Sequence, residues 1–216
     1  MDQILEFFHK LQDVKALVVW GGYVGLTAII FAETGLLIGF FLPGDSLLVT
    51  AGIFASQGHF NIFLLGALLS AASILGNAAG YYIGRVAGGR LFTREESRFF
   101  KPRYLYQAHA FYEKHGGKAV VLARFMPIVR TFVPVVAGAA GMDYGKYTLY
   151  NIVGGVLWIW GMLFTGDVLN RYIPGVERHT GWVILVVILL SFLPGVIGWL
   201  RSRNKQPVDD AGVSTH

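Results

Sequence analysis

Residues 119–141 constrain this chain more than any other stretch. The run AVVLARFMPIVRTFVPVVAGAAG is as apolar as a membrane-embedded segment, yet it contains Arg124 and Arg130, with prolines at Pro127 and Pro134. A charged side chain at the bilayer centre costs about 2.5–3.5 kcal/mol, so each arginine needs a partner, an aqueous cavity or an anionic ligand. Proline removes helix hydrogen bonds, and irregular backbone at membrane depth survives only where it is buried in protein or lines a cavity. The segment therefore predicts a re-entrant or broken helix that lines a polar site.

The composition predicts an all-α integral membrane protein with several crossings. The chain is 54% hydrophobic and 14% charged, whereas soluble proteins contain about 25% charged residues. It has no cysteine, and its histidines show no metal-ligand spacing, so we expect neither a metal nor a cofactor. The net charge of +5 comes mostly from loops. In a membrane protein such charge reports orientation rather than a nucleic-acid partner. The first residues lack the pattern of a cleaved signal peptide.

Apolar runs and their interruptions predict a single transmembrane domain over residues 1–205, followed by a disordered tail over 206–216. The expected elements are an interfacial amphipathic helix (1–15), a first span (16–36), a re-entrant hairpin (37–58), a span (59–84), a basic cytoplasmic loop with an amphipathic helix (85–118), a second re-entrant hairpin (119–141), and two further spans (145–169 and 181–200).

Charge and internal similarity predict how these elements are arranged. By the positive-inside rule, the basic loop and the basic residues after the last span are cytoplasmic, which gives cytoplasmic N- and C-termini. The two hairpins then enter from opposite sides. The halves also share short motifs, such as Phe-Leu-Pro at 41–43 and Phe-Val-Pro at 132–134. We therefore expect two inverted repeats whose interrupted segments meet near the midplane, as in many transporters.

Four embedded charges form the candidate site. Glu33 and Asp45 lie in the first half, and Arg124 and Arg130 lie in the second. One interpretation is a purely structural network, because intramembrane charges commonly pair with one another. In the other, the arginines bind an anionic headgroup, since guanidinium groups match phosphate oxygens bidentately. The acids would then neutralise the empty site or carry a coupling proton.

Other residues are expected to support this site or to pack helices. The supporting set is Pro43, Gly44, Asn77, Pro127, Pro134 and Asn151. Glycines recur every four residues from Gly76 to Gly88, a small-residue pattern that favours close helix packing and also permits a homodimer. Trp158 and the other late tryptophans fit helix faces and interface belts.

In combination, these motifs resemble bacterial DedA-family membrane proteins. The motifs are Phe31-Ala-Glu33-Thr-Gly35, Phe41-Leu-Pro43-Gly44-Asp45, Gly80-Tyr81-x2-Gly84-Arg85, Ala123-Arg124-Phe-x-Pro127-x2-Arg130-Thr-Phe-x-Pro134, and Tyr150-Asn151-x2-Gly154. The resemblance runs from about residue 15 to residue 200. It implies an inner-membrane protein with two re-entrant hairpins, essential acids at Glu33 and Asp45, and essential arginines at Arg124 and Arg130.

The resemblance also implies a function in lipid traffic. Family members are implicated in returning undecaprenyl phosphate across the membrane and in proton-dependent envelope homeostasis. We therefore expect a non-enzymatic flippase that moves a polyprenyl monophosphate from the outer to the inner leaflet. The alternatives are a proton-coupled transporter or antiporter of a small solute, a membrane phosphatase, and a non-transporting membrane-assembly factor. A phosphatase needs an acid-base or nucleophilic histidine beside an arginine cluster, and no Pro-Ser-Gly-His segment is present.

Overall fold

The computed structural model describes residues 14–36, 44–91 and 117–173, and within them every regular element is a helix. Three helices are long and apolar enough to cross a membrane by length and composition: α2 (Val14–Gly35), α4 (Ile62–Leu91) and α8 (Tyr144–Tyr172). The shorter helices are α3 (Gly44–Ser56), α6 (Lys118–Ala123) and α7 (Pro127–Ala139). The expected all-helical membrane fold is thus confirmed. Pro43, most of the N-terminal helix, most of the basic loop, the last span and the tail lie outside the described residues.

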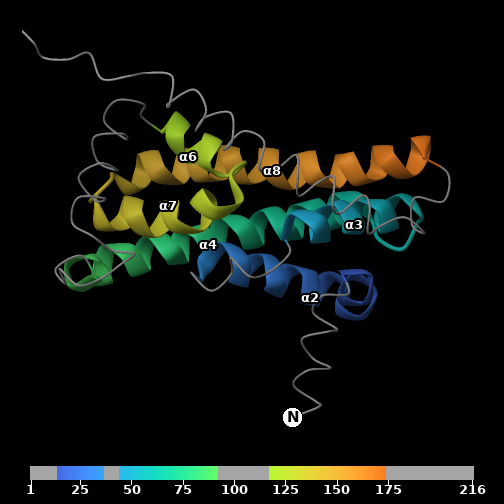
Figure 1. Cartoon of the computed structure of the whole chain (residues 1–216), viewed down its shortest axis with the longest axis horizontal. Helices are drawn as coiled ribbons and strands as arrows, with labels where there is room; N and C mark the ends of the chain where they lie inside the picture. The colour runs from blue at the N-terminus through green and yellow to red at the C-terminus, as the bar shows by residue number, and fades with distance from the viewer. Residues whose placement is uncertain (1–13, 37–43, 92–116, 174–216) are drawn as a thin grey trace, which may run out of the picture.

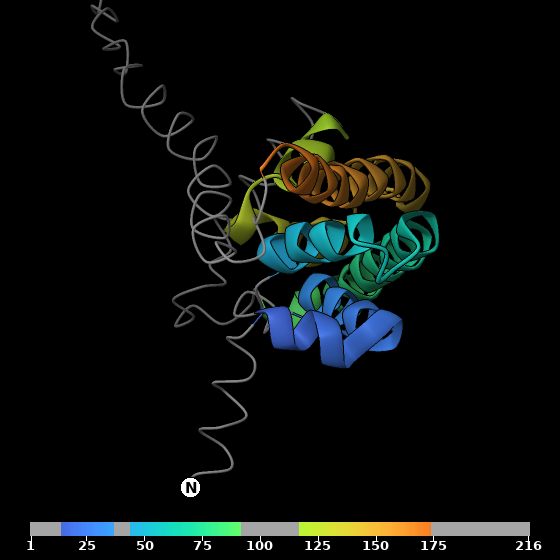
Figure 2. The same cartoon turned by 90° about the vertical axis from the view of Figure 1, so that its right-hand side faces the viewer.

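The two long helices α4 and α8 lie side by side, and each carries a short helix from the other half of the chain (Figure 1). Helix α3 packs mainly on α8, and α7 packs mainly on α4. Figure 2 shows α2 on one outer face of this bundle and α8 with α6 on the opposite face. The packing therefore exchanges elements between the two halves.

Reciprocal glycines bring α3 and α8 into backbone contact. A Cβ added at Gly52 of α3 would lie 2.2 Å from the carbonyl oxygen of Leu163, and one added at Gly166 of α8 would lie 2.1 Å from that of Val49. No side chain fits at either position, because the obstructing atoms belong to the backbone. The two helices therefore approach as closely as small-residue contacts allow.

The same pattern occurs where α4 crosses α7. A Cβ at Gly84 of α4 would lie 2.0 Å from the carbonyl oxygen of Val135, and one at Gly138 of α7 would lie 2.0 Å from that of Tyr81. The two crossings share one spacing. On every helix, the glycine lies three residues after the residue whose carbonyl oxygen faces the glycine of the other helix. The predicted packing role of the glycine stripe on α4 is confirmed at Gly84.

Helix α2 runs beside α4 in the same direction and ends near its middle. At the start of α4, the backbone N–H of Asn61 donates to the hydroxyl of Tyr23 at 2.7 Å. At the other end of α2, a Cβ on Gly35 would lie 2.9 Å from the carbonyl oxygen of Gly76, which is about halfway along α4. Helix α2 is also interrupted at Gly22, whose φ of 51° lies in the left-handed region that favours glycine.

These bounds differ from the expected ones in two places. The expected first span over 16–36 is broken at Gly22, although α2 as a whole is long and apolar enough to cross a membrane. Helix α4 continues past the expected end of its span at residue 84 and reaches Leu91. The start of the expected basic loop is therefore helical.

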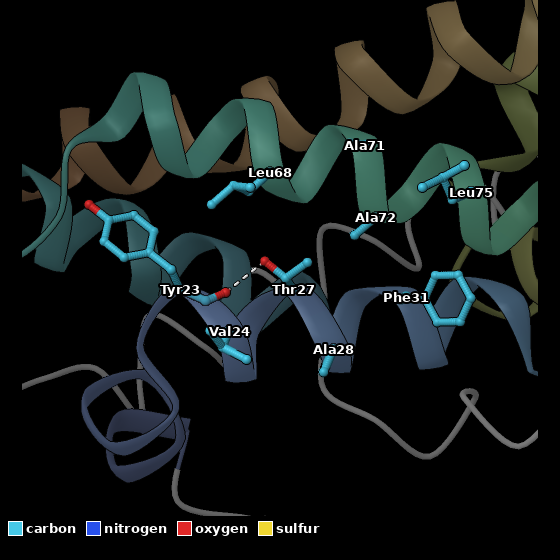
Figure 3. A pocket seen from close by; sticks show the side chains of 9 residues that line it. All are labelled: Tyr23, Val24, Thr27, Ala28, Phe31, Leu68, Ala71, Ala72 and Leu75. Carbon is cyan, nitrogen blue, oxygen red and sulfur yellow. Dashed lines mark hydrogen bonds between the residues drawn. The ribbon is translucent and has the colours of Figure 1, made fainter.

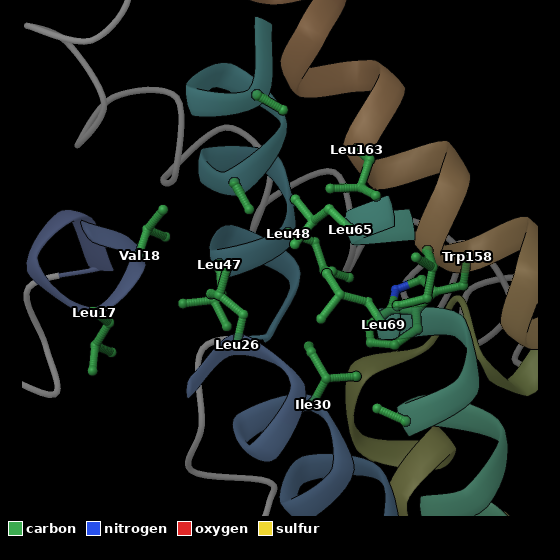
Figure 4. Packing of buried hydrophobic residues seen from close by; sticks show 14 residues of the cluster. Leu17, Val18, Leu26, Ile30, Leu47, Leu48, Leu65, Leu69, Trp158 and Leu163 are labelled. Atoms are coloured by element: carbon green, nitrogen blue, oxygen red, sulfur yellow. The ribbon is translucent and has the colours of Figure 1, made fainter. Parts of the chain in front are cut away.

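An apolar core joins the first half of the chain to α8 (Figure 4). Its central members come from α2, α3, α4 and α8, and they are Leu26, Ile30, Leu47, Leu48, Leu65, Leu69, Trp158 and Leu163. Each of these side chains is almost fully buried. The core lies beside the end of α2 and the start of α3, where the embedded acids are found.

Two glycines of α8 offer a matched test of the close helix crossing. Gly166→Ala introduces a methyl group where the carbonyl oxygen of Val49 lies 2.1 Å away, whereas a Cβ at Gly161 meets nothing within 4 Å. We expect Gly166→Ala to destabilise the protein by about 1–3 kcal/mol through overpacking. Gly161→Ala should be neutral or slightly stabilising, because alanine favours helix. Thermal unfolding in detergent measures both, and equal melting temperatures would contradict the crossing.

Candidate functional site

Arg130 joins both embedded acids at the centre of the molecule. Its Nη1 donates to Oδ1 of Asp45 at 2.5 Å, and its Nη2 forms an ion pair with Glu33. The guanidinium carbon lies 4.6 Å from the ring centroid of Trp158, within cation–π range. The indole N–H of Trp158 also donates to Oδ1 of Asp45, at 2.9 Å. We call these four residues the Arg130 clamp.

Helix ends place the charged groups of the clamp. Glu33 lies in the last turn of α2, and Asp45 lies in the first turn of α3, where the helix dipole favours a carboxylate. Arg130 lies in the first turn of α7, which Pro127 begins, as proline commonly does. Gly44 leaves room for the acid, since a Cβ there would lie 1.6 Å from Oε2 of Glu33. The breaks in the helices thus bring the charges together.

Pro134 interrupts the hydrogen bonding of α7 and packs against α4. It lies inside α7, where it cannot donate a hydrogen bond to the carbonyl of Arg130. Its ring packs against Gly80 of α4, at which an added Cβ would lie 3.1 Å from the Cβ of Pro134. Pro134 therefore forms part of the α4–α7 contact.

Arg124 is also buried, but its ligands are neutral. It lies in the turn between α6 and α7, where Nη1 donates to the hydroxyl of Ser73 at 2.6 Å and Nη2 donates to Oδ1 of Asn151. The side chain of Asn77 completes the set. Because a guanidinium only donates, the Asn77 atom 2.7 Å from Nη2 is the amide oxygen, and the amide nitrogen then donates to the carbonyl of Thr34 at 3.0 Å. We call Ser73, Asn77 and Asn151 the neutral cage.

The structural network that was one interpretation of the four charges is present for only one of the two arginines. Both acids are bound by Arg130, and no carboxylate among the described residues forms an ion pair with Arg124. Glycines make room for the Arg124 side chain: a Cβ at Gly154 would lie 3.0 Å from its Cδ, and one at Gly155 would lie 3.3 Å from its Nη2. The embedded charges therefore form two unlike arginine sites.

Sequence reasoning missed three residues of these sites. Trp158 was expected at a helix face or membrane interface, yet it is buried in the clamp. Ser73 was not considered, and Tyr147, whose hydroxyl donates to the carbonyl of Asn77 at 3.1 Å, was not either. For Tyr147 and Trp158, the spacing from Asn151 in the sequence indicates a shared helix face. Tyr147 and Trp158 lie four residues before and seven residues after Asn151, which is the repeat of one helix face.

The described residues contain no group of three or more His, Cys, Asp or Glu side chains that could hold a metal ion. A groove of about 530 Å³ lies between α2 and α4, away from the charges (Figure 3). It is lined by Tyr23, Val24, Thr27, Ala28, Phe31, Leu68, Ala71, Ala72 and Leu75. These side chains carry no charge, so the groove is not the anion site.

Two arginine–carboxylate pairs offer a matched comparison of stability. Arg130→Gln leaves Glu33 and Asp45 buried without their cation, and breaking a buried pair in this way typically costs about 3–5 kcal/mol. Arg171→Gln removes a pair with Asp167 in which the arginine side chain is 69% exposed, and such a pair is worth about 0–1 kcal/mol. We expect Tm in detergent to fall sharply for the first variant only. A similar Tm for both would show that the clamp does not stabilise the fold.

Comparisons with known proteins agree with the embedded motifs. The model of the VTT domain matches residues 42–168. The chain is 43% identical to Protein DedA of Escherichia coli K12 over 198 residues, which cover 91% of this chain and 90% of that protein. It is 45% identical to an uncharacterized membrane protein of Mycobacterium leprae, covering 82% of this chain and 79% of the relative. It is 33% identical to inner membrane protein YghB of Escherichia coli K12, covering 82% of each.

No solved structure matches the chain. The family match and the relatives confirm the resemblance that the motifs indicated, and they agree with three apolar helices that are long enough to cross a membrane. The chain belongs to the VTT-domain, or DedA, family of membrane proteins.

Proposed function

We propose that this protein is a membrane lipid translocase that moves a polyprenyl monophosphate, such as undecaprenyl phosphate, from the outer to the inner leaflet. The observation that carries the proposal is the set of buried charges where four helix ends meet, halfway along the two long helices. Intramembrane charges at such a depth mark a ligand or ion pathway. No covalent step is required, so we propose a carrier rather than an enzyme.

The path of the chain supports two re-entrant hairpins. The part of α2 after Gly22 begins beside the start of α4 and ends beside its middle, and α3 then leads back to the start of α4. Each arm is too short for the roughly 20 residues that a crossing needs. Helices α6 and α7 form the second hairpin, around the break at residues 124–126. We thus propose that the first hairpin includes α2, which replaces the expected span over 16–36.

The glycine crossings support inverted repeats. In one crossing, Val49 and Gly52 of the first hairpin face Leu163 and Gly166 of α8. In the other crossing, Val135 and Gly138 of the second hairpin face Tyr81 and Gly84 of α4. The residues of each pair are three positions apart. Because α4 and α8 run in opposite directions, hairpins held in the same way on each of them enter from opposite sides. Such a design brings the interrupted helices together near the midplane.

This arrangement also revises the expected orientation. The basic residues after α4 favour a cytoplasmic position for that end of the bundle. Since α2 and α4 start on the same side, Val14 then lies on the outer side, and the N-terminus lies outside rather than in the cytoplasm. Residues 1–15 contain two lysines, against eight lysines and arginines over 85–118, so the charge bias favours the basic loop as the inner side. The C-terminus stays cytoplasmic in our proposal. The inner membrane is favoured because the relative YghB is named an inner membrane protein.

A phosphate monoester suits the site chemically. It carries about −1.5 to −2 charges near neutral pH and several strong acceptor oxygens, and it is the natural counterpart of a buried guanidinium. The helix faces outside the bundle are apolar, with exposed Leu, Val and Phe side chains along α8. A long hydrocarbon tail can therefore stay in lipid while the headgroup occupies the interior. Protons remain candidate co-substrates, because the clamp holds two acids and one arginine.

The proposal is tested by reconstituting the purified protein in vesicles with a fluorescent polyprenyl monophosphate. We expect protein-dependent movement of this lipid between leaflets and no protein-dependent movement of the matching polyprenol, because the polyprenol lacks the anion. Protein-free vesicles are the control. Equal movement of both lipids, or of neither, would reject the assignment. Uptake of a small solute that ignores added polyprenyl phosphate would instead favour the proton-coupled transporter.

The proposed topology has its own test, which the absence of cysteine makes simple. Single cysteines at Lys15 and Gln57 should both react with an impermeant thiol reagent from outside in intact cells, because the first hairpin enters from that side. A cysteine at Lys146, in the first turn of α8, should react only after the membrane is opened. Protection of the Lys15 position together with labelling at Gln57 would restore a cytoplasmic N-terminus.

A further inference from the structure

We infer that Arg124, rather than Arg130, is the group that binds the phosphate, and that the neutral cage keeps it free of carboxylates for this purpose. The inference rests on the proposed function, because it divides the work of the two arginines in that site. It assigns the ligand class to one buried cation and leaves the other with a structural role.

The two arginines differ in how their charge is balanced. Both Nη atoms of Arg130 already bind carboxylates, and its flat face is covered by Trp158. An added anion there meets two acids and is repelled. Arg124 is just as deeply buried, but among the described residues it is held only by side-chain oxygens of the neutral cage. Buried charges are normally paired, so Arg124 lacks the counter-ion that its surroundings call for.

The Nε atoms of Arg124 and Arg130 are both buried without a hydrogen-bond partner, so this donor does not distinguish the two arginines. A further unused donor is found beside the neutral cage. Ser70 lies one turn before Ser73 on the same face of α4, and its buried hydroxyl also lacks a partner. Hydroxyl and guanidinium N–H groups donate to an oxyanion, and a phosphate needs several such donors. The glycines at 154 and 155 leave room for the Arg124 side chain itself.

The position of Arg124 favours a lipid headgroup over a free phosphate. Arg124 itself is 3% exposed, but its neighbours Leu122 and Phe125 are 66% and 39% exposed on the outside of the bundle. The segment from Leu122 to Phe125 thus carries exposed apolar side chains next in sequence to the buried guanidinium. A headgroup that reaches Arg124 past this segment leaves its hydrocarbon tail against Leu122 and Phe125. Free phosphate gains nothing from these apolar side chains.

The test compares binding of three probes to purified protein in detergent: a polyprenyl monophosphate, the matching polyprenol, and inorganic phosphate. The wild-type chain should bind the polyprenyl monophosphate most tightly. Arg124→Gln should weaken this binding by about ten- to a hundredfold, the equivalent of one lost charge-assisted hydrogen bond. Its Tm should stay close to that of the wild type, because glutamine can still donate to the neutral cage. Arg171→Gln, the same change at an exposed arginine, should bind like the wild type.

A second variant keeps Arg124 and gives it a carboxylate partner within the protein. Asn77→Asp puts a carboxylate where the amide oxygen now lies 2.7 Å from Nη2. This internal anion competes with the phosphate, so binding should weaken about tenfold or more although the arginine is intact. Asn77→Ser, which is neutral, should weaken binding far less.

The outcomes separate this inference from the proposed function. If the wild type binds the lipid and folded Arg124→Gln or Asn77→Asp binds it equally well, Arg124 is not the anion receptor, although translocation of the lipid stands. Equal affinity for inorganic phosphate and the polyprenyl phosphate would reject the lipid headgroup as the ligand. If the wild type binds neither phosphate probe, both the inference and the proposed function fail.

Discussion

The rest of the site depends on one interaction, the contact of Arg130 with both Glu33 and Asp45. It connects α7 to the ends of α2 and α3, which are far from it in sequence. Trp158 adds α8 to the same point by covering the guanidinium and donating to Asp45. Charges this deep are costly unless their hydrogen bonds are satisfied. The clamp therefore fixes the relative position of both interrupted regions and of one long helix.

The clamp explains why the second arginine can be different. With both acids on Arg130, the buried charge near Arg124 depends on amide and hydroxyl dipoles alone. Neutral ligands orient a guanidinium without cancelling its charge. Gly154 and Gly155 leave room for the Arg124 side chain, and the Tyr147 hydroxyl donates to the backbone carbonyl of Asn77. An arginine paired with carboxylates and an arginine held by neutral ligands thus lie in one core.

Much of this could be predicted from the sequence, and the exceptions have physical reasons. Arg124, Arg130, Glu33 and Asp45 are conspicuous because charge in an apolar run is costly, and their burial follows directly. Which acid meets which arginine depends on helix register over long sequence separations, and no local pattern encodes that. The apolar run over 16–58 is long enough for a crossing plus a hairpin, so length concealed the break at Gly22. Trp158 is equally suited to lipid or to the core, and only its spacing from Asn151 indicated the polar face.

The exchanged packing gives the clamp a mechanical consequence. Helix α3 packs on α8, and α7 packs on α4, through close contacts at glycines. If one helix slid along the other, a larger side chain would meet the backbone at these points. Neither α3 nor α7 can move without carrying or leaving the long helix on which it packs. The first movement also separates Arg130 from at least one acid. Such a movement leaves a buried charge without its partner, which is strongly destabilising. The Arg130 clamp therefore resists separation of the two packed pairs.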